Sequence, residues 1–357
     1  MGKYINYYDD ILPILDSDGL EPSIIQIISN RSDGKTINGL AYLINQYKTN
    51  NEKFVLLYRN GYQLKCELIF NYDLKEIMKK DYNIEYDKVV GEFIIKDTVY
   101  QLSADFGNGM EVIGYSVSLK KYEIIKPYSG IFANVKNVFF DEVQLEDGNY
   151  LKNEVEKCFI STIATIGRGG GEQSRKLKIF LVSNLISLLS PYLVYYNIYK
   201  RYDFNKETGQ IIRNKGNIAI FRLNKNAVIS FKNNTMYNGM ENSSYYKMLT
   251  GLDFLRKENL NTVQKLTGKF SYIATIIINN NKIGIRVYKG GIIHLGNYDP
   301  NCNKIYITNM DDYDENYYIF KKSRLEEIIK DSFAQGRVRF ATVEIRQCFL
   351  EILAISI

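Results

Sequence analysis

The sequence predicts an α/β protein with two domains, the first of them built on a mostly parallel β-sheet. Apolar runs of strand length alternate with amphipathic stretches from the start of the chain to about Pro191, which is the pattern of strands joined by crossover helices. The chain has 357 residues, whereas one domain usually has about 100–200 residues. With 45% hydrophobic and 24% charged residues, it carries enough apolar surface for two cores.

The first domain is assigned to residues 1–198, where this alternation is continuous. The expected strands are Ser23–Ile28, Phe54–Tyr58, Val89–Ile95, Val112–Ser118, Val135–Phe140 and Leu177–Val182, and the expected helices are Ile37–Tyr47 and Asp73–Lys80. Two of the strands, Val135–Phe140 and Leu177–Val182, are apolar almost throughout, as are strands that are covered on both faces. We therefore place these two strands at the centre of the sheet.

A polar segment rich in Asn, Lys and Arg, residues 199–226, is expected to be a linker or lid. The second domain is assigned to residues 227–357, and its main signal is a strand–turn–strand pattern around Asn279–Asn281. The expected strands are Phe270–Ile278, Lys282–Tyr288, Ile292–Leu295 and Lys304–Thr308, and the expected helices are Tyr245–Arg256, Ser323–Gln335 and Glu344–Leu353. These elements predict a second α/β unit.

Charge and cysteine content exclude several classes of protein. The net charge of +6 permits contact with polyanions but is far from that of a strongly basic nucleic-acid-binding domain. The four cysteines are scattered and accompanied by one histidine, so neither a zinc site nor a disulfide framework is indicated. The start MGKYINYYDD has no apolar signal-peptide core, and no apolar run reaches about 18 residues, so we expect a cytoplasmic protein without a membrane segment.

The segment between the first expected strand and the helix after it matches a phosphate-binding loop. It reads Ser29-Asn30-Arg31-Ser32-Asp33-Gly34-Lys35-Thr36. In such a loop the backbone N–H groups face the phosphates, the lysine reaches the β- and γ-phosphates, and the hydroxyl binds Mg²⁺. Lys35 and Thr36 fit these roles, but Ser29 replaces the consensus glycine and Asp33 adds a carboxylate to an anion site. A chance surface turn is the alternative.

The run Val138–Phe140 is an apolar strand that ends in two carboxylates, Asp141 and Glu142. That is the Walker B arrangement, in which the first carboxylate holds Mg²⁺ and the second acts as general base towards the attacking water. A strand that ends in a solvated acidic turn is the alternative. Because both patterns fall in one parallel sheet, they support each other and predict an ATPase that uses ATP and Mg²⁺.

Ser183 and Asn184 end another buried strand, at the carboxyl edge where open α/β sheets bind ligands. Asn184 is therefore a candidate sensor of the γ-phosphate or of the lytic water. The alternative is that the two side chains only cap the following helix.

Three arginines are candidates for a role in hydrolysis. Arg168 and Arg175 lie in the glycine-rich stretch GRGGGEQSR, and either is a candidate arginine finger for a neighbouring subunit, because a guanidinium neutralises charge on the transferred phosphoryl group. A solvated glycine-rich hairpin is the alternative. Arg31, inside the phosphate loop, is a candidate link between the nucleotide and a moving element, and a solvent-facing arginine is its alternative.

Together these stretches resemble the DNA-packaging ATPases, or encapsidation proteins, of small short-tailed bacteriophages related to the Bacillus podophages. The resemblance covers nearly the whole chain. In the first domain its stretches are IISNRSDGKT, FVLLYRNGYQL, VIGYSVSLKKYEIIK, NVKNVFFDE and FLVSNLISLLSPYLVYYNIY. In the second domain they are NNNKIGIRVYKGGIIHLGNYDPNCNKIYITNMDD and the helix before RVRF. Several motifs in the right order are more specific than the phosphate loop alone.

The resemblance implies that the first domain has the ASCE, terminase-like P-loop ATPase fold. It also implies a homomeric ring, expected to be a pentamer, on the capsid portal, with ATP at subunit interfaces and double-stranded DNA in the channel. The family's roles in binding and hydrolysis pass to Lys35, Thr36, Asp141 and Glu142. Asn184 falls in the family's coupling motif, and the trans-acting arginine lies between Walker B and that motif, which leaves Arg168 and Arg175 open, with Arg168 preferred.

The resemblance further implies an RNase H-like second domain with a vestigial nuclease site. Two-metal nucleases need several carboxylates around ions about 4 Å apart, but the acidic residues here lie largely in one polar turn. They are Asp299, Asp311, Asp312, Asp314 and Glu315. The basic residues that are candidates for binding phosphates without sequence preference are Lys282, Arg286, Lys289, Lys304, Arg337 and Arg339. Some relatives hold a structural RNA with this domain, so RNA is a further candidate partner.

The expected function is ATP-driven translocation of double-stranded viral DNA into a preformed capsid by a ring at the portal. One alternative is a terminase-like protein whose second domain still cuts DNA. The other is a non-catalytic, nucleotide-gated capsid assembly factor, which Ser29 and Asp33 would suit. We expect the protein in the host-cell cytoplasm, transiently on the procapsid and absent from the mature virion.

Overall fold

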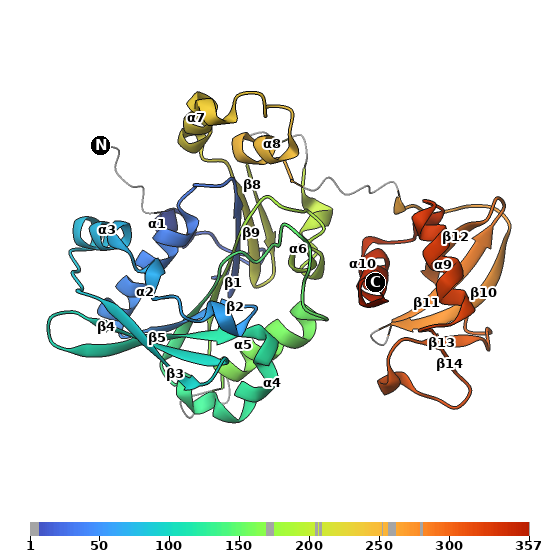
Figure 1. The fold of residues 1–357 in the computed structure, drawn as a ribbon, viewed down its shortest axis with the longest axis horizontal. Coiled ribbons are helices and arrows are strands. Elements are labelled where there is room, and N and C mark those ends of the chain that lie inside the picture. Colours follow the sequence, from blue (N-terminus) through green and yellow to red (C-terminus); the bar gives the residue numbers. More distant parts are fainter. Residues whose placement is uncertain are drawn as a thin grey trace. The chain divides into compact units, whose positions relative to one another are not determined.

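The chain forms two compact units in a computed structural model that describes residues 7–168, 175–203, 206, 209–251, 253–255, 262–278 and 281–356. The first unit comprises residues 1–257 and the second unit residues 258–357 (Figure 1). None of the described helices is both long enough and apolar enough to span a membrane.

The first unit is built on one nine-stranded sheet in the order β3-β4-β5-β2-β6-β7-β1-β9-β8. The strands are β1 Ile24–Ser29, β2 Lys53–Tyr58, β3 Val89–Ile95, β4 Val99–Asp105, β5 Met110–Ser118, β6 Val135–Phe140, β7 Lys178–Asn184, β8 Gln210–Asn214 and β9 Asn217–Arg222. The strands from β5 to β9 in this order run parallel, whereas β4 pairs antiparallel with β3 and β5, and β8 with β9. β6 and β7 lie in the middle of the sheet, which confirms their predicted place.

Helices cover both faces of this sheet, which is why the central residues of β6 and β7 are apolar and buried (Figure 1). The helices are α1 Tyr7–Ile11, α2 Lys35–Asn50, α3 Tyr72–Tyr82, α4 Tyr122–Ile125, α5 Ile160–Ile166 and α6 Pro191–Tyr195. On one face, residues such as Leu43 of α2 and Met78 of α3 pack against Phe180 of β7 and its neighbours. On the other face, Phe140 of β6 packs among residues that include Phe159.

The predicted linker, residues 199–226, is wrong, because this segment contains two strands of the sheet. β9 pairs in parallel with β1 and is buried along most of its length. β8 is the last strand of the sheet, and its residues alternate between buried and exposed. β8 has only five residues, and the polar residues before it and in the turn to β9 gave the segment the composition of a linker.

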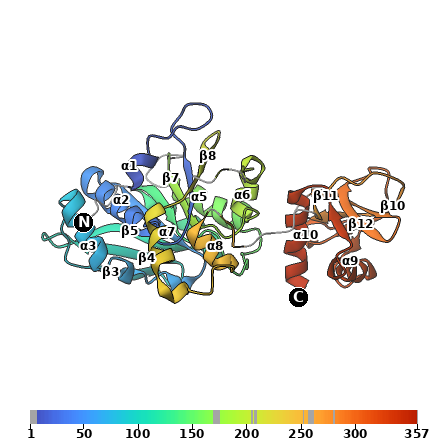
Figure 2. The ribbon, with the colours of Figure 1, turned by 90° about the horizontal axis from the view of Figure 1, so that it is seen from above.

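The predicted domain boundary at residue 227 is corrected for the same reason. Helices α7 Lys225–Asn233 and α8 Ser244–Thr250 lie side by side in both ribbon views (Figure 1; Figure 2). Met248 and Leu249 of α8 are buried in a cluster that includes Ile28 of β1 and Phe221 of β9. The two helices therefore belong to the first unit, and the expected helix Tyr245–Arg256 ends at Thr250.

The second unit is a six-stranded sheet in the order β14-β13-β10-β11-β12-β15, and it confirms the predicted α/β fold. Its elements are β10 Phe270–Ile278, β11 Asn281–Tyr288, β12 Ile292–Asn297, β13 Ile305–Ile307, β14 Tyr318–Ile319, α9 Arg324–Ala334, β15 Val338–Phe340 and α10 Val343–Ser356. β10, β11 and β12 are antiparallel, and β13 and β14 follow parallel to β10, which is the order of an RNase H-like sheet. Of the predicted turn Asn279–Asn281, residues 279 and 280 lie outside the described residues.

Candidate functional site

The candidate site is a pocket of about 280 Å³ at the carboxyl ends of β1, β6 and β7. Ligands of open α/β sheets bind at this edge because loops and helix N-termini converge there. The residues that line the pocket are Arg31, Ser32, Asp33, Gly34, Lys35, Thr36, Ile37, Asp141, Glu142, Ser183 and Asn184. The phosphate loop, the Walker B carboxylates and the end of β7 therefore meet in one place.

Lys35 is the first residue of α2 and is buried beneath the pocket. Its ammonium donates hydrogen bonds to Ser29 Oγ at 2.9 Å, to the Asn30 carbonyl at 2.9 Å and to Asn184 Oδ1 at 3.2 Å. Burial lowers the pKa of Lys35 to about 8, and the nearby Asp33 and Asp141 carboxylates limit that fall. The substituted consensus glycine, Ser29, thus orients the lysine rather than blocking the loop.

Gly34 gives the chain the sharp turn into α2. Its φ of 80° and ψ of 11° lie in the left-handed region that glycine adopts without strain. A Cβ atom here would also approach Asn38 Nδ2 to 2.7 Å. The N-terminus of α2 therefore opens directly onto the pocket, where its partial positive charge favours an anion.

Thr36 and Asp141 form the expected Mg²⁺ position. The Thr36 hydroxyl donates a hydrogen bond to Asp141 Oδ2 at 2.5 Å. Burial raises the pKa of Asp141, and the hydrogen bonds from Thr36 and from the Glu142 backbone N–H oppose that rise. A hydroxyl and a buried carboxylate at the mouth of a phosphate site suit Mg²⁺, which usually takes only one or two protein oxygens and leaves the rest to water and phosphate.

Glu142 lies beside the pocket with an unusual backbone. Its φ of 52° is in the left-handed region, although it is not a glycine. Its N–H donates to Asp141 Oδ1 at 2.9 Å. Burial and the adjacent Asp141 charge raise the pKa of Glu142, which makes its carboxylate a stronger base than that of an ordinary glutamate.

The end of β7 adds a polar side chain with no visible partner. The Ser183 hydroxyl is buried and has no hydrogen-bond partner among the described residues, yet Ser183 lines the pocket. Buried polar groups in proteins are nearly always paired, so this hydroxyl is available to a bound polar ligand. Asn184, which accepts from Lys35, lies where the sequence predicted a sensor of the γ-phosphate.

The phosphate loop is tied to the helices that follow β9. Asn30 is buried, and its side chain donates to the Leu249 carbonyl of α8 at 3.2 Å and accepts from the Asn224 N–H at 3.0 Å. The exposed Arg31 donates to the Tyr245 hydroxyl of α8. Asn30 therefore offers the nucleotide only its backbone, whereas Arg31 lines the pocket and also contacts α8.

Asp33 does not stand as an isolated charge at the anion site. Its side chain is buried, and Oδ1 lies 4.0 Å from Nε of Arg222 at the end of β9. The positive charge of Arg222 partly neutralises the Asp33 carboxylate and so reduces its repulsion of a bound phosphate.

Arg168 and Arg175 lie away from this pocket. Both line a second cavity, of about 630 Å³, with Ser23, which precedes β1 at the opposite edge of the sheet. Arg175 is buried and donates to the carbonyls of Ala133, Val135 and Ile166, so its guanidinium is engaged within its own chain, which favours Arg168 as the finger; the finger role of either arginine stays a prediction. Arg168 is exposed. Residues 169–174 of the predicted loop lie outside the described residues.

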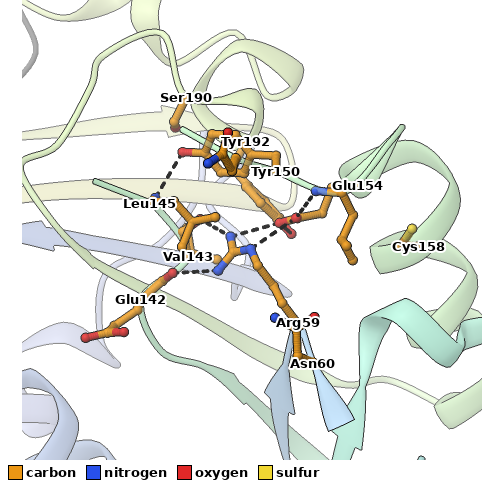
Figure 3. Close-up of polar contacts among 12 residues, drawn as sticks. Arg59, Asn60, Glu142, Val143, Leu145, Tyr150, Glu154, Cys158, Ser190 and Tyr192 are labelled. Atoms are coloured by element: carbon orange, nitrogen blue, oxygen red, sulfur yellow. Dashed lines mark hydrogen bonds and ion pairs between the residues drawn. The ribbon is translucent and has the colours of Figure 1, made fainter. Parts of the chain in front are cut away.

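Sequence patterns did not identify Arg59 and Glu154, which brace the Walker B segment (Figure 3). Arg59 follows β2 and forms an ion pair with Glu154, with 2.8 Å between Nη2 and Oε1. Its Nη1 also donates to the Glu142 carbonyl at 2.8 Å. In the sequence, Arg59 could be noticed as an arginine directly after the apolar strand, in FVLLYR. No local pattern identifies Glu154 as its partner, because Glu154 lies much later in the chain.

In the second unit, the acidic residues considered for a nuclease site lie in loops and in a short 3-10 helix, Met310–Asp312. They are Asp299, Asp311, Asp312, Asp314 and Glu315. The described residues contain no group of three or more His, Cys, Asp or Glu side chains placed to hold a metal ion. Of the predicted phosphate-binding residues, Lys282 and Arg286 lie on β11 and Arg339 on β15. Arg286 stacks over Phe270, with 4.8 Å between the guanidinium carbon and the ring centre.

The chain is similar to a known protein family and to solved structures. A family model described as podovirus DNA encapsidation protein (Gp16) matches residues 20–355. The structure resembles a chain of the bacteriophage phi-29 viral genome packaging motor assembly, with 19% identity, 94% of this chain and 96% of that chain covered, and a TM-score of 0.61. It also resembles the phi-28 gp11 DNA packaging motor, with 16% identity, 94% of each chain covered and a TM-score of 0.61.

No curated protein sequence matches the chain. The two structural likenesses show the fold over nearly the whole chain, and the family match spans both units. The chain therefore belongs to the family of podovirus DNA encapsidation proteins, as its motifs suggested.

Proposed function

We propose that the protein hydrolyses ATP and uses the free energy to move double-stranded DNA into a preformed phage capsid. The observation that carries the proposal is the convergence of Lys35, Thr36, Asp141 and Glu142 on one pocket. Membership in an encapsidation family supports DNA as the cargo and a capsid as its destination. The pocket supports a nucleoside triphosphate as the energy source, because it combines a helix N-terminus, a buried ammonium and two carboxylates.

The triphosphate of ATP would lie at the N-terminus of α2 within reach of the Lys35 ammonium. A phosphate oxygen near this ammonium would stabilise its charged form, which burial now disfavours. Thr36 and Asp141 would hold Mg²⁺, which when bound neutralises charge on the phosphates. Glu142 would accept a proton from the attacking water, and Asn184 would contact the γ-phosphate.

Arg168 is proposed to act on the ATP of the neighbouring subunit. It is exposed and lies at the edge of the sheet opposite its own pocket, so contact with a bound nucleotide requires a second copy of the chain. The two similar solved structures are packaging motors, which supports a ring at the portal, and we expect five subunits. A guanidinium supplied across such an interface typically accelerates hydrolysis by about 10³–10⁵-fold.

The second unit is proposed to contact nucleic acid through Lys282, Arg286, Lys289, Lys304, Arg337 and Arg339. Contacts to phosphates would make binding independent of sequence and weaker at high salt. DNA is the expected ligand, and a structural RNA is a second candidate for the same surface. We place the protein in the host cytoplasm and on the procapsid during packaging, and not in the mature virion.

The proposal is tested by ATP hydrolysis with and without double-stranded DNA, in wild type and in Lys35→Ala. Arg168→Ala subunits are then mixed into wild type. We expect DNA-stimulated turnover that disappears in Lys35→Ala and is inhibited by substoichiometric Arg168→Ala, because each site would use an arginine from its neighbour. Absence of turnover, with DNA and procapsids present, would instead support a nucleotide-gated assembly factor.

A further inference from the structure

A buried ion pair between Arg59 and Glu154 contacts the backbone of the Walker B segment at Glu142 and Val143 (Figure 3). Arg59 presents its guanidinium to Glu154, with Nε at 3.0 Å from Oε2 and Nη2 at 2.8 Å from Oε1. The side chains are only 8% and 1% exposed. This two-pronged geometry fixes the orientation of the guanidinium plane, which a single contact from a lysine would not do.

Both carboxylate oxygens of Glu154 accept hydrogen bonds. Glu154 also accepts hydrogen bonds from the Leu151 N–H at 2.9 Å and from the Tyr192 hydroxyl at 3.0 Å. Each carboxylate oxygen therefore has two donors. Buried polar groups in proteins are nearly always paired in this way, so the Glu154 carboxylate is held in one orientation.

Aromatic rings and backbone hydrogen bonds fix the position of Arg59. Its guanidinium lies over the rings of Phe140, at 4.9 Å, and Tyr150, at 5.4 Å from the ring centres. Its backbone carbonyl accepts from Ser118 Oγ, the last residue of β5, at 3.2 Å and from the Lys120 N–H, in the 3-10 helix that follows β5, at 3.1 Å. Arg59 is thus fixed to the two strands that flank it and to the helical segment that carries Glu154.

The remaining N–H groups of Arg59 point at the backbone of the candidate general base. Nη1 donates to the Glu142 carbonyl at 2.8 Å, and Nη2 donates to the Val143 carbonyl. Glu142 has a φ of 52°, which is unfavourable for a residue with a Cβ. Such a conformation persists when its surroundings hold it, and these two hydrogen bonds hold the two peptides that follow the Glu142 Cα.

We propose that the Arg59–Glu154 pair is a positioning device that holds the Glu142 backbone in its left-handed conformation and so aims the Glu142 carboxylate at the attacking water. This inference rests on the proposed ATPase function. Neither residue lines the nucleotide pocket, although Arg59 lines an adjoining cavity of about 430 Å³ that also includes Thr36, Asp141 and Glu142. The Arg59 guanidinium donates to Glu154 and to the Glu142 and Val143 carbonyls, so we assign both residues a role that acts through Glu142. The pair should therefore determine the rate of hydrolysis and leave nucleotide affinity unchanged.

The test compares Arg59→Lys and Glu154→Gln with wild type under saturating DNA, measuring kcat, KM and nucleotide affinity. Arg213→Lys is the matched control. It removes the guanidinium of an exposed arginine on β8, away from the site. We expect kcat to fall by about 10²-fold in both variants, the size of effect that a small misplacement of a catalytic group produces. KM and nucleotide affinity should stay within about twofold of wild type.

A second arm repeats Arg59→Lys in a Glu142→Gln background with single-turnover kinetics. If Arg59 acts through Glu142, the double variant should hydrolyse ATP no more slowly than Glu142→Gln alone. Multiplicative losses, or a wild-type kcat in folded Arg59→Lys, would overturn the inference. Tyr192→Phe, which keeps the ion pair and removes one donor to Glu154, should give a smaller loss of kcat and serves if the other variants fail to fold.

Different results would exclude the ATPase function and the positioning role. If wild type shows no turnover, or if Glu142→Gln hydrolyses ATP like wild type, the proposed function is wrong. If turnover needs Lys35 and Glu142 but is indifferent to Arg59 and Glu154, only the positioning role is wrong.

Discussion

The Thr36 hydroxyl donates a hydrogen bond to Asp141 at 2.5 Å, although the two residues are 105 positions apart in the chain. This contact joins the start of α2 to the end of β6 and holds the two expected Mg²⁺ ligands together through a side-chain hydrogen bond. Such preorganisation lowers the reorganisation required when nucleotide and metal bind.

Thr36→Ala should therefore weaken Mg²⁺-dependent nucleotide binding and hydrolysis by at least about 10-fold, a typical effect of disturbing a metal site. Thr36→Ser keeps the hydroxyl and should retain most activity. Titration of hydrolysis with Mg²⁺ at fixed ATP measures the effect, and Thr49→Ala, at the exposed end of the same helix, is the control. Equal Mg²⁺ dependence in Thr36→Ala and wild type would exclude Thr36 as a ligand.

The lowered pKa of Lys35 predicts a pH dependence of nucleotide binding. The pKa of about 8 in the free protein means that the ammonium is mostly charged at neutral pH and loses its proton as pH rises through that value. Since phosphates bind the charged form, the affinity for Mg²⁺-free nucleotide should fall progressively above about pH 8. A fluorescent ATP analogue titrated between pH 6.5 and 9.5 measures this, and an affinity that is flat across the range would contradict it.

The two arginines of the glycine-rich segment should behave differently. Arg175→Ala leaves three carbonyls without their donor, so the free energy of unfolding should fall by about 1.5–3 kcal/mol. Arg168→Ala should leave stability unchanged and abolish most turnover. Thermal or urea unfolding of the two variants checks the first expectation, and a stable, inactive Arg175→Ala would reverse the assignment.

Asn30 should link the phosphate loop to α8. Asn30→Ala removes the partner of both the Leu249 carbonyl and the Asn224 N–H, so unfolding of the first unit should become easier by about 1–3 kcal/mol. Hydrogen exchange of residues 244–250 should also increase. Asn50→Ala at the exposed end of α2 is the control, and unchanged exchange in Asn30→Ala would show that the link is not needed.

Sequence patterns predicted the phosphate site well because its parts are local. β1, the loop and α2 are contiguous, and a consensus pattern describes a contiguous segment. The Walker B carboxylates follow a strand that is apolar because both faces are covered, so that strand was also predictable.

The same patterns could not predict interactions that depend on burial or on distant contacts. Nothing in a glycine-rich segment distinguishes a buried Arg175 from an exposed Arg168. Arg59 and Glu154 are 95 residues apart, and only the fold brings them together. The edge strand β8 was predicted as a linker because it is short and polar residues flank it on both sides, and that error moved the domain boundary.

The central claim is that hydrolysis at this pocket drives DNA into the capsid. Its most direct test is packaging of DNA into procapsids of the same phage, scored as nuclease-protected DNA, with wild type and Glu142→Gln. We predict that Glu142→Gln binds ATP with wild-type affinity and packages no DNA, because it lacks the proton acceptor for hydrolysis. Packaging at the wild-type rate by Glu142→Gln would contradict the account.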